Sequence, residues 1–138
     1  CVIFPRDHAW CKKKSVTLPE LMSQPFVIRE KGSATRELYE SFLQKSNLIA
    51  HKQFNIRGEV GSSEAIKEAV IAGWGVSVIS VHAVSRELSQ GLLCGIPLQG
   101  YSMERNFYLI YRRQFDFRPY HKTFIKYIKS YMPEDVKL

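Results

Sequence analysis

The chain has 138 residues and a formal charge of +7, because 20 Lys and Arg residues face 13 Asp and Glu residues. Its 45% hydrophobic and 24% charged residues are typical of a globular domain and exclude a disordered, collagen-like or disulfide-framework chain. No apolar run reaches the ~18 residues that cross a bilayer, no signal peptide is present, and the three cysteines form no CxxC pair, so we expect a cytoplasmic chain without membrane contact.

Strand and helix patterns alternate along the chain. The first residues, CVIF, are expected to form a buried strand without any lead-in sequence, which indicates a piece of a longer protein. This alternation predicts an α/β fold with a parallel or mixed sheet and helices on its faces. The expected strands cover residues 1–4, 26–29, 54–60, 76–79, 92–98 and 107–111. The expected helices cover residues 19–22, 35–46, 63–73, 81–90 and 118–131, the last with Phe124, Ile125, Ile128 and Tyr131 facing inward.

Motifs for catalysis and metal binding are missing from the sequence. There is no GxSxG, HExxH or GxxxxGK[ST] motif, and no GxGxxG follows a strand. Cys1, His8 and Cys11 are close in sequence, but a fourth zinc ligand cannot be assigned. Cys94 lies in an apolar strand and is expected in the core. We therefore predict no enzyme activity, no cofactor and no metal site.

Two strand-to-helix junctions share the same chemistry. Gly32-Ser33-Ala34-Thr35 follows the strand at 26–29, and Gly61-Ser62-Ser63 follows the strand that ends at residue 60. The first N–H groups of a helix have no partner within it, so a nearby hydroxyl either caps the helix or helps to hold an anionic ligand. Because the carboxyl ends of parallel strands meet at one edge of a sheet, two such junctions favour a ligand crevice.

Basic residues accompany these junctions and the last helix. Arg29 and Arg36 flank the first junction, where they either bind a carboxylate, phosphate or sulfate or pair with neighbouring glutamates. Lys122, Lys126 and Lys129 share one helix face, which is expected to be solvated; an anionic ligand, a dimer partner or nucleic acid is the alternative.

The two junctions resemble a known family. The segments PFVIREKGSATR (25–36) and GSSEAIKEAVIAGWGVSVIS (61–80) are similar to the effector-binding domain of LysR-type transcriptional regulators. The later segments at 88–98 and 108–112 follow the same order, so the resemblance covers residues 2–131. Ser80 stands where the family usually has proline.

The resemblance implies a type 2 periplasmic-binding-protein-like fold, with two α/β subdomains, mixed sheets and an effector cleft between them. Residues 1–18 and 85–138 would belong to an incomplete subdomain I, and residues 20–82 to subdomain II. DNA would be bound only through a winged helix-turn-helix domain that this chain lacks, in a homo-oligomer (dimer or tetramer). A solute-binding protein of similar fold is the alternative. The resemblance implies that a small polar or anionic effector is contacted by Phe4, Pro5, Arg29, Ser33, Thr35, Gly61, Ser62 and Ser63.

Overall fold

A computed structural model describes residues 1–45, 53–104, 106 and 108–131 of the chain. The chain divides into two compact units, residues 1–103 and residues 104–137. No helix in the described ranges is both long and apolar enough to cross a membrane.

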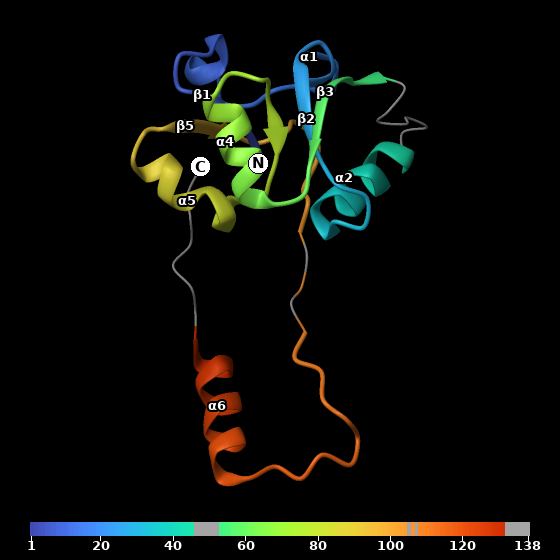
Figure 1. Ribbon diagram of the computed structural model, residues 1–138, viewed down its shortest axis with the longest axis vertical. Coiled ribbons are helices and arrows are strands. Elements are labelled where there is room, and N and C mark those ends of the chain that lie inside the picture. The colour runs from blue at the N-terminus through green and yellow to red at the C-terminus, as the bar shows by residue number, and fades with distance from the viewer. Residues whose placement is uncertain (46–52, 105, 107, 132–138) are drawn as a thin grey trace. The chain divides into compact units, whose positions relative to one another are not determined.

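Five strands form the centre of the first unit (Figure 1). Their bounds are Val2–Pro5 (β1), Pro25–Arg29 (β2), Asn55–Val60 (β3), Ser77–Val78 (β4) and Leu93–Ile96 (β5). β4, β1 and β5 pair in that order, with β1 antiparallel to both neighbours, while β2 and β3 are parallel. A parallel bridge between Phe26 and Val76 joins β2 to the start of β4. The order across the strands is therefore β3-β2-β4-β1-β5, and the strand directions are mixed, as predicted.

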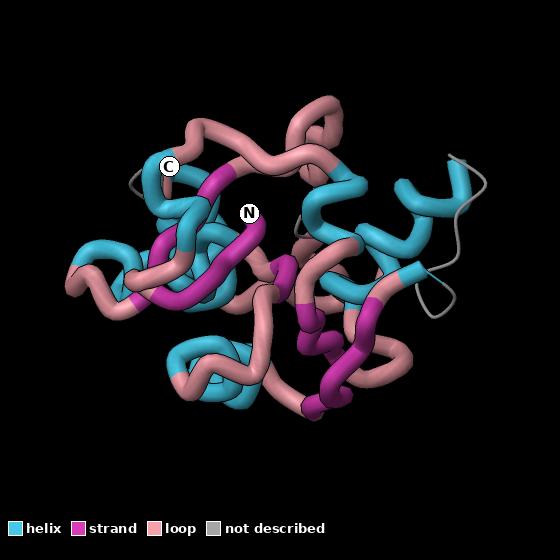
Figure 2. The backbone as a smooth tube through the Cα atoms, turned by 90° about the horizontal axis from the view of Figure 1, so that it is seen from above, coloured by secondary structure: helices cyan, strands magenta, loops and turns pink. Residues whose placement is uncertain are grey.

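Helices pack on both faces of these strands. Successive side chains of a strand point to opposite faces. Phe26 and Ile28 of β2 accordingly join one hydrophobic cluster, and Val27 joins the other. The helices of this unit are η1 (Ala9–Lys12, a 3-10 helix), α1 (Leu18–Met22), α2 (Ala34–Lys45), α4 (Ser63–Ile71) and α5 (Val81–Ser89). The first cluster includes buried residues of η1, α1 and α2, and the second includes buried residues of α4 and α5. Figure 2 shows the strands in magenta with helices in cyan around them.

Local sequence signals explain where these helices begin. Thr17 and Glu20 form a capping box at α1: Thr17 Oγ1 accepts from the Glu20 amide, and Glu20 Oε2 accepts from the Thr17 amide at 2.9 Å. The Ser62 hydroxyl caps α4 by accepting from the Ala65 amide at 3.0 Å. The capping alternative for the second junction is therefore confirmed.

Gly75 allows β4 to reach β2. Its φ is +155°, and a Cβ atom at this position would lie 2.2 Å from the carbonyl oxygen of Pro25. That same carbonyl accepts a hydrogen bond from the Val76 amide at 2.8 Å. Only glycine fits so close an approach between the two backbones. The turn between α4 and β4 thus also forms the junction of the two strand groups.

The units of the structure do not coincide with the expected subdomain limits. The boundaries expected near residues 18–20 and 82–85 fall inside the first unit, where β1 pairs with both β4 and β5. The assignment of residues to subdomains I and II stays a prediction.

The second unit contains α6 (Pro119–Ser130). The strand expected over 107–111 begins outside the described residues, and its described part, 108–111, forms no strand. An extended segment becomes a strand only when a neighbour supplies hydrogen-bond partners, and no strand pairing of the described chain involves these residues. Ile110 is accordingly 87% exposed. This part of the prediction was wrong.

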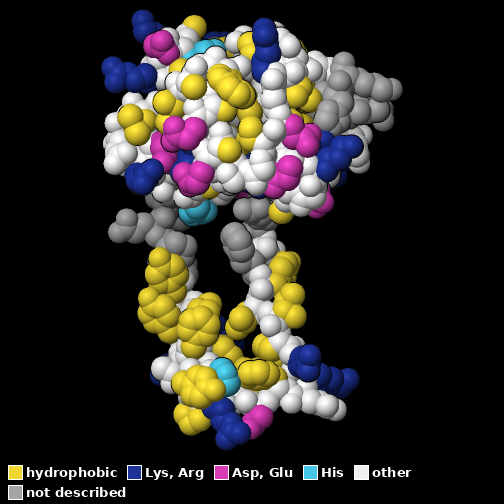
Figure 3. Space-filling model, in the orientation of Figure 1, with side chains coloured by type: hydrophobic (Ala, Val, Ile, Leu, Met, Phe, Trp, Pro, Cys, Tyr) yellow, Lys and Arg dark blue, Asp and Glu magenta, His cyan; other side chains and the backbone are white. Residues whose placement is uncertain are grey.

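The inward face predicted for the last helix is also not buried. Phe124, Ile128 and Tyr131 are exposed, Ile125 is half-buried, and α6 has no buried residue. Hydrophobic side chains therefore gather on the surface of this unit (Figure 3). The helical period was read correctly, but burial requires a second element against the apolar face.

Candidate functional site

The predicted junctions meet at one edge of the strands. Arg29 is the last residue of β2, and Val60 is the last residue of β3, directly before Gly61 and the start of α4. β2 and β3 are parallel, with Arg29 opposite Val60 in the register. The carboxyl ends of both strands therefore bring the two junctions together, as the sequence predicts.

Arg29 connects the two junctions directly. Its Nη1 donates a 3.0 Å hydrogen bond to Oγ of Ser63, the first residue of α4. Its Nε and Nη2 donate to the two carboxylate oxygens of Glu30 at 2.7 and 2.8 Å. The hydrogen bonds with Glu30 raise the pKa of the Arg29 guanidinium and lower the pKa of the Glu30 carboxyl. Both groups are therefore charged at neutral pH.

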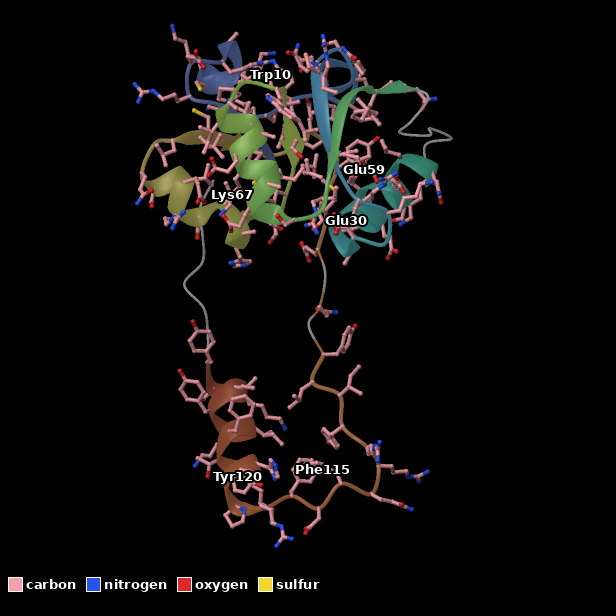
Figure 4. The ribbon with its side chains drawn as sticks, viewed as in Figure 1. Trp10, Glu30, Glu59, Lys67, Phe115 and Tyr120 are labelled. Atoms are coloured by element: carbon pink, nitrogen blue, oxygen red, sulfur yellow. The ribbon has the colours of Figure 1, made fainter. Side chains whose placement is uncertain are left out.

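A second arginine supports this edge from α2. Arg36 is 2% exposed, and its Nη1 donates to the carbonyl oxygen of Arg29 at 2.8 Å and to Oε2 of Glu59 at 2.7 Å. Its Nε donates to Oε1 of Glu40 at 2.8 Å. Burial opposes its charge, but the hydrogen bonds with Glu59 and Glu40 outweigh burial and raise the pKa of Arg36. Figure 4 shows Glu59 on β3 and Glu30 at the end of β2.

The pairing alternative is thus confirmed for both arginines. Sequence reasoning named Arg29 and Arg36 but gave no role to Glu59 on β3. The only available signal for Glu59 was its place beside the last residue of a strand parallel to β2.

The hydroxyl residues of the two junctions differ in exposure. Ser33 precedes α2 and is 7% exposed, and its carbonyl oxygen accepts from the Glu37 amide at 2.9 Å. Thr35 and Ser63 are half-buried, and Ser62 is exposed. Gly61 is exposed, and a Cβ built on it would meet no atom within 4 Å. Gly61 therefore leaves open space beside the start of α4.

Phe4 and Pro5 lie at the opposite edge. β1 is antiparallel to β4, with Val2 opposite Val78, so the start of β1 is near the carboxyl end of β4 and its last residues point away from it. At ~3.3 Å per residue, β2 alone separates the two edges by roughly 13 Å. Phe4 is also fully buried, with its ring 5.7 Å from that of Trp10. Within the first unit, the structure does not bring this pair to the other candidates.

A buried ion pair holds the helix that carries Ser63. Nζ of Lys67, on α4, lies 3.0 Å from Oε1 of Glu87, on α5, and both side chains are almost fully buried. Burial favours neutral Lys67, but hydrogen bonds with Glu64 and Glu87 dominate and raise its pKa. Burial likewise opposes the Glu87 charge, and Lys67 outweighs it and lowers the Glu87 pKa. The sequence does not reveal this pair, because its two residues lie 20 positions apart on different helices.

The groups at this edge have the chemistry to bind an anion. A guanidinium, several hydroxyls and the first amides of α4 are donors that suit a carboxylate or phosphate. Glu30 occupies two of the Arg29 donors, so an anion has to take its place or use the remaining ones. In the described part of the chain, no three His, Cys, Asp or Glu side chains are grouped to hold a metal ion.

The family assignment follows from comparison with known sequences. Residues 1–133 match the family described as the LysR substrate binding domain. The chain is 32% identical over 127 residues to the HTH-type transcriptional activator CmpR of Synechocystis, covering 92% of this chain and 40% of CmpR. It is 33% identical over 130 residues to a RuBisCO operon transcriptional regulator of Allochromatium vinosum, covering 94% of this chain and 41% of that protein.

Solved structures give the same fold. The CcmR regulatory domain of Synechocystis in complex with 2-PG matches with a TM-score of 0.77 and 29% identity over 92% of this chain and 59% of that one. The effector binding domain of QuiR in complex with shikimate matches with a TM-score of 0.71 and 19% identity, over 95% of this chain and 62% of that one. The predicted type 2 periplasmic-binding-protein-like fold is confirmed.

This chain belongs to the LysR substrate-binding domain family. The named relatives are transcriptional regulators rather than enzymes, and they give no support to the alternative of a solute-binding protein. The chain spans about 40% of the length of these curated relatives.

Proposed function

We propose that this chain is the effector-sensing part of a LysR-type transcription factor, and that it binds a small anion where β2 and β3 end and α4 begins. The observation that carries this proposal is the hydrogen bond of Arg29 to Ser63, which joins both junctions at one edge. An anion at that place receives hydrogen bonds from a guanidinium, from hydroxyls and from the first amides of α4. Ser33, Thr35, Gly61 and Ser62 complete the proposed site.

The relatives support an anionic effector. The CcmR regulatory domain was solved with 2-PG, and QuiR with shikimate. We propose an effector of the same general kind, a small molecule with an anionic group. Phe4 and Pro5 stay predicted effector contacts, at a distance from the Arg29 edge within the first unit.

Signalling would be allosteric. The effector must bind one arrangement of the protein more tightly than another, because equal affinity for both shifts no equilibrium. In this proposal the winged helix-turn-helix domain lies outside this chain, a dimer or tetramer binds the DNA, and the regulator acts in the cytoplasm. The two-subdomain division with its inter-subdomain cleft, predicted from the family resemblance, belongs to the same proposal.

Binding is tested by thermal shift and calorimetry on the full-length protein with 2-PG, inorganic phosphate and shikimate. At a hundredfold excess over its Kd, a ligand of the native state adds about 2.7 kcal/mol of stability, so the melting temperature rises in a saturable way. Ser63→Ala and Arg29→Gln are expected to weaken binding at least ~10-fold, or about 1.4 kcal/mol, because each removes a donor.

Ser89→Ala is the matched control. Its hydroxyl donates within α5, to the carbonyl oxygen of Arg86 at 2.8 Å, so its loss should leave affinity unchanged. No saturable shift with any of the three anions, from a protein that melts cooperatively, would contradict the proposal. Equal affinity of wild type and Ser63→Ala would move the site away from α4.

A further inference from the structure

Arg29 already binds a carboxylate, and this carboxylate belongs to the chain itself. One carboxylate oxygen of Glu30 lies 2.7 Å from Nε of Arg29, and the other lies 2.8 Å from Nη2. Two parallel hydrogen bonds of this kind are also the way in which a guanidinium binds a free carboxylate or phosphate. The Glu30 side chain therefore occupies the Nε–Nη2 edge of Arg29, the edge that an oxyanion of an effector would use.

The guanidinium of Arg29 is held in place independently of Glu30. Its third nitrogen, Nη1, donates to Oγ of Ser63 at 3.0 Å. Nη1 of Arg36 donates to the main-chain carbonyl oxygen of Arg29 at 2.8 Å, and the Arg29 side chain is 15% exposed. Because these two contacts come from α4 and α2, they persist when the Glu30 carboxylate turns away.

The Glu30 side chain can leave by rotation of its own bonds. It directly follows β2 (Figure 4), and it is 37% exposed. The Glu30 amide donates to the carbonyl oxygen of Val60 at 3.1 Å, and the Glu30 carbonyl oxygen accepts from the Ser33 amide at 3.2 Å. These main-chain bonds hold the backbone, whereas an ion pair in contact with water is only weakly stabilised. The carboxylate can thus exchange with a dissolved anion while the fold stays the same.

A second anion on the same guanidinium is unfavourable while Glu30 stays bound. Two negative groups on one guanidinium repel each other at close range. At the other edge of Arg29, Nη1 already donates to Ser63, so an anion there competes with the serine oxygen. An oxyanion that satisfies both of its oxygens at Arg29 therefore has to replace Glu30 at the Nε–Nη2 edge.

We propose that Glu30 is a built-in competitor of the effector: its carboxylate occupies Arg29 until a carboxylate or phosphate of the effector displaces it. This inference rests on the proposed anion site and describes the regulation of that site. Because the Nε–Nη2 edge is open for only a fraction of the time, the apparent affinity for the effector is reduced by the same fraction. Glu30 thereby raises the effector concentration at which the site fills.

The test is calorimetry with 2-PG and inorganic phosphate on the full-length protein, as wild type and as Glu30→Gln. Glutamine keeps the size of the side chain but offers one neutral acceptor oxygen, so it cannot form the two-bond pair with Arg29. A water-exposed ion pair favours its closed form by a factor of up to about 5, and Glu30→Gln should lower the Kd of both anions by about that factor.

Glu37→Gln is the matched control. It removes the same charge from the exposed first turn of α2. Within the described part of the chain, the Arg29 guanidinium hydrogen-bonds to Glu30 and Ser63 and not to Glu37, so this variant should leave the Kd unchanged.

The effect of Glu30→Gln should also depend on Arg29. In an Arg29→Gln background there is no guanidinium to occupy, so adding Glu30→Gln should no longer tighten binding. If Glu30 acted only by repelling an anion through space, its removal would tighten binding equally in both backgrounds. That result, or equal tightening by Glu37→Gln, would overturn the inference.

The remaining outcomes separate this inference from the site on which it rests. A wild type that binds the anions, together with a Glu30→Gln variant that binds them no more tightly, would overturn the competitor role and leave the anion site standing. Binding that appears only in Glu30→Gln would support both. If neither protein binds either anion, the anion site itself fails, and the competitor role fails with it.

Discussion

The buried ion pair between α4 and α5 gives the sharpest stability prediction. Lys67 and Glu87 are 5% and 3% exposed, so removing one partner leaves the other charge buried. Such a loss usually costs about 3–5 kcal/mol, whereas replacing both partners by apolar residues is often close to neutral. Lys67→Met is expected to lower the free energy of unfolding by about 3 kcal/mol, the lower end of this range, because Arg86 still lies 3.0 Å from Glu87 Oε1.

The reasoning is checked by a double-mutant cycle in urea. Lys67→Met, Glu87→Leu and the double variant are unfolded, and their free energies of unfolding are compared with that of the wild type. The double variant should be clearly more stable than the sum of the two single losses predicts. Among the described residues, the buried Glu87 Oε2 finds no hydrogen-bond partner, so the intact pair already carries a cost that the apolar pair avoids. Additive losses would refute the argument.

Three further predictions concern the same unit. Gly75→Ala should cost at least about 2 kcal/mol by thermal unfolding, since its Cβ would lie 2.2 Å from the Pro25 carbonyl oxygen, while Gly61→Ala, with nothing within 4 Å, should cost far less. Ser62→Ala should cost about 1 kcal/mol even without effector, because it removes the cap of α4; an unchanged melting temperature would contradict this. Folding lowers the pKa of Glu87, so the ionised carboxyl contributes its full stability above the ordinary carboxyl pKa of 4.5, and this stability is lost as pH falls through the folded pKa. Urea unfolding between about pH 7 and pH 3 should therefore show a fall in the free energy of unfolding that the Glu87→Leu variant lacks.

The sequence was most informative where structure is local. The strand and helix on either side of residues 32–35, and again of residues 61–63, follow from period, glycine and hydroxyl signals, and all four elements form where they are expected. Because β2 and β3 are also parallel, the two junctions meet at one edge as predicted, and the structure adds that Arg29 reaches Ser63 there.

The sequence does not show the direction of the first strand relative to its neighbours or which side chains pair between distant elements. A buried strand has the same alternation in either direction, so nothing in CVIF shows that β1 is antiparallel to β4 and carries Phe4 and Pro5 to the far edge. The Lys67–Glu87 pair depends equally on tertiary packing, because a lysine or a glutamate on an amphipathic helix is ordinarily solvated. The same limit explains residues 108–111, where a strand pattern exists without a paired strand.

The short strand β4 has a consequence for how the first unit unfolds. Only Ser77 and Val78 form β4 proper, yet this segment connects β1 on one side with β2 on the other, through the Val27 and Val76 amides and the buried Ser77 hydroxyl at 2.7 Å from the Val27 carbonyl oxygen. The β2-β3 pair and the β4-β1-β5 group are therefore joined through the hydrogen bonds of this short segment. If the unit opens as a whole, these two amides should be among the slowest to exchange with deuterium; if the halves separate first, they should exchange well before the amides inside either half.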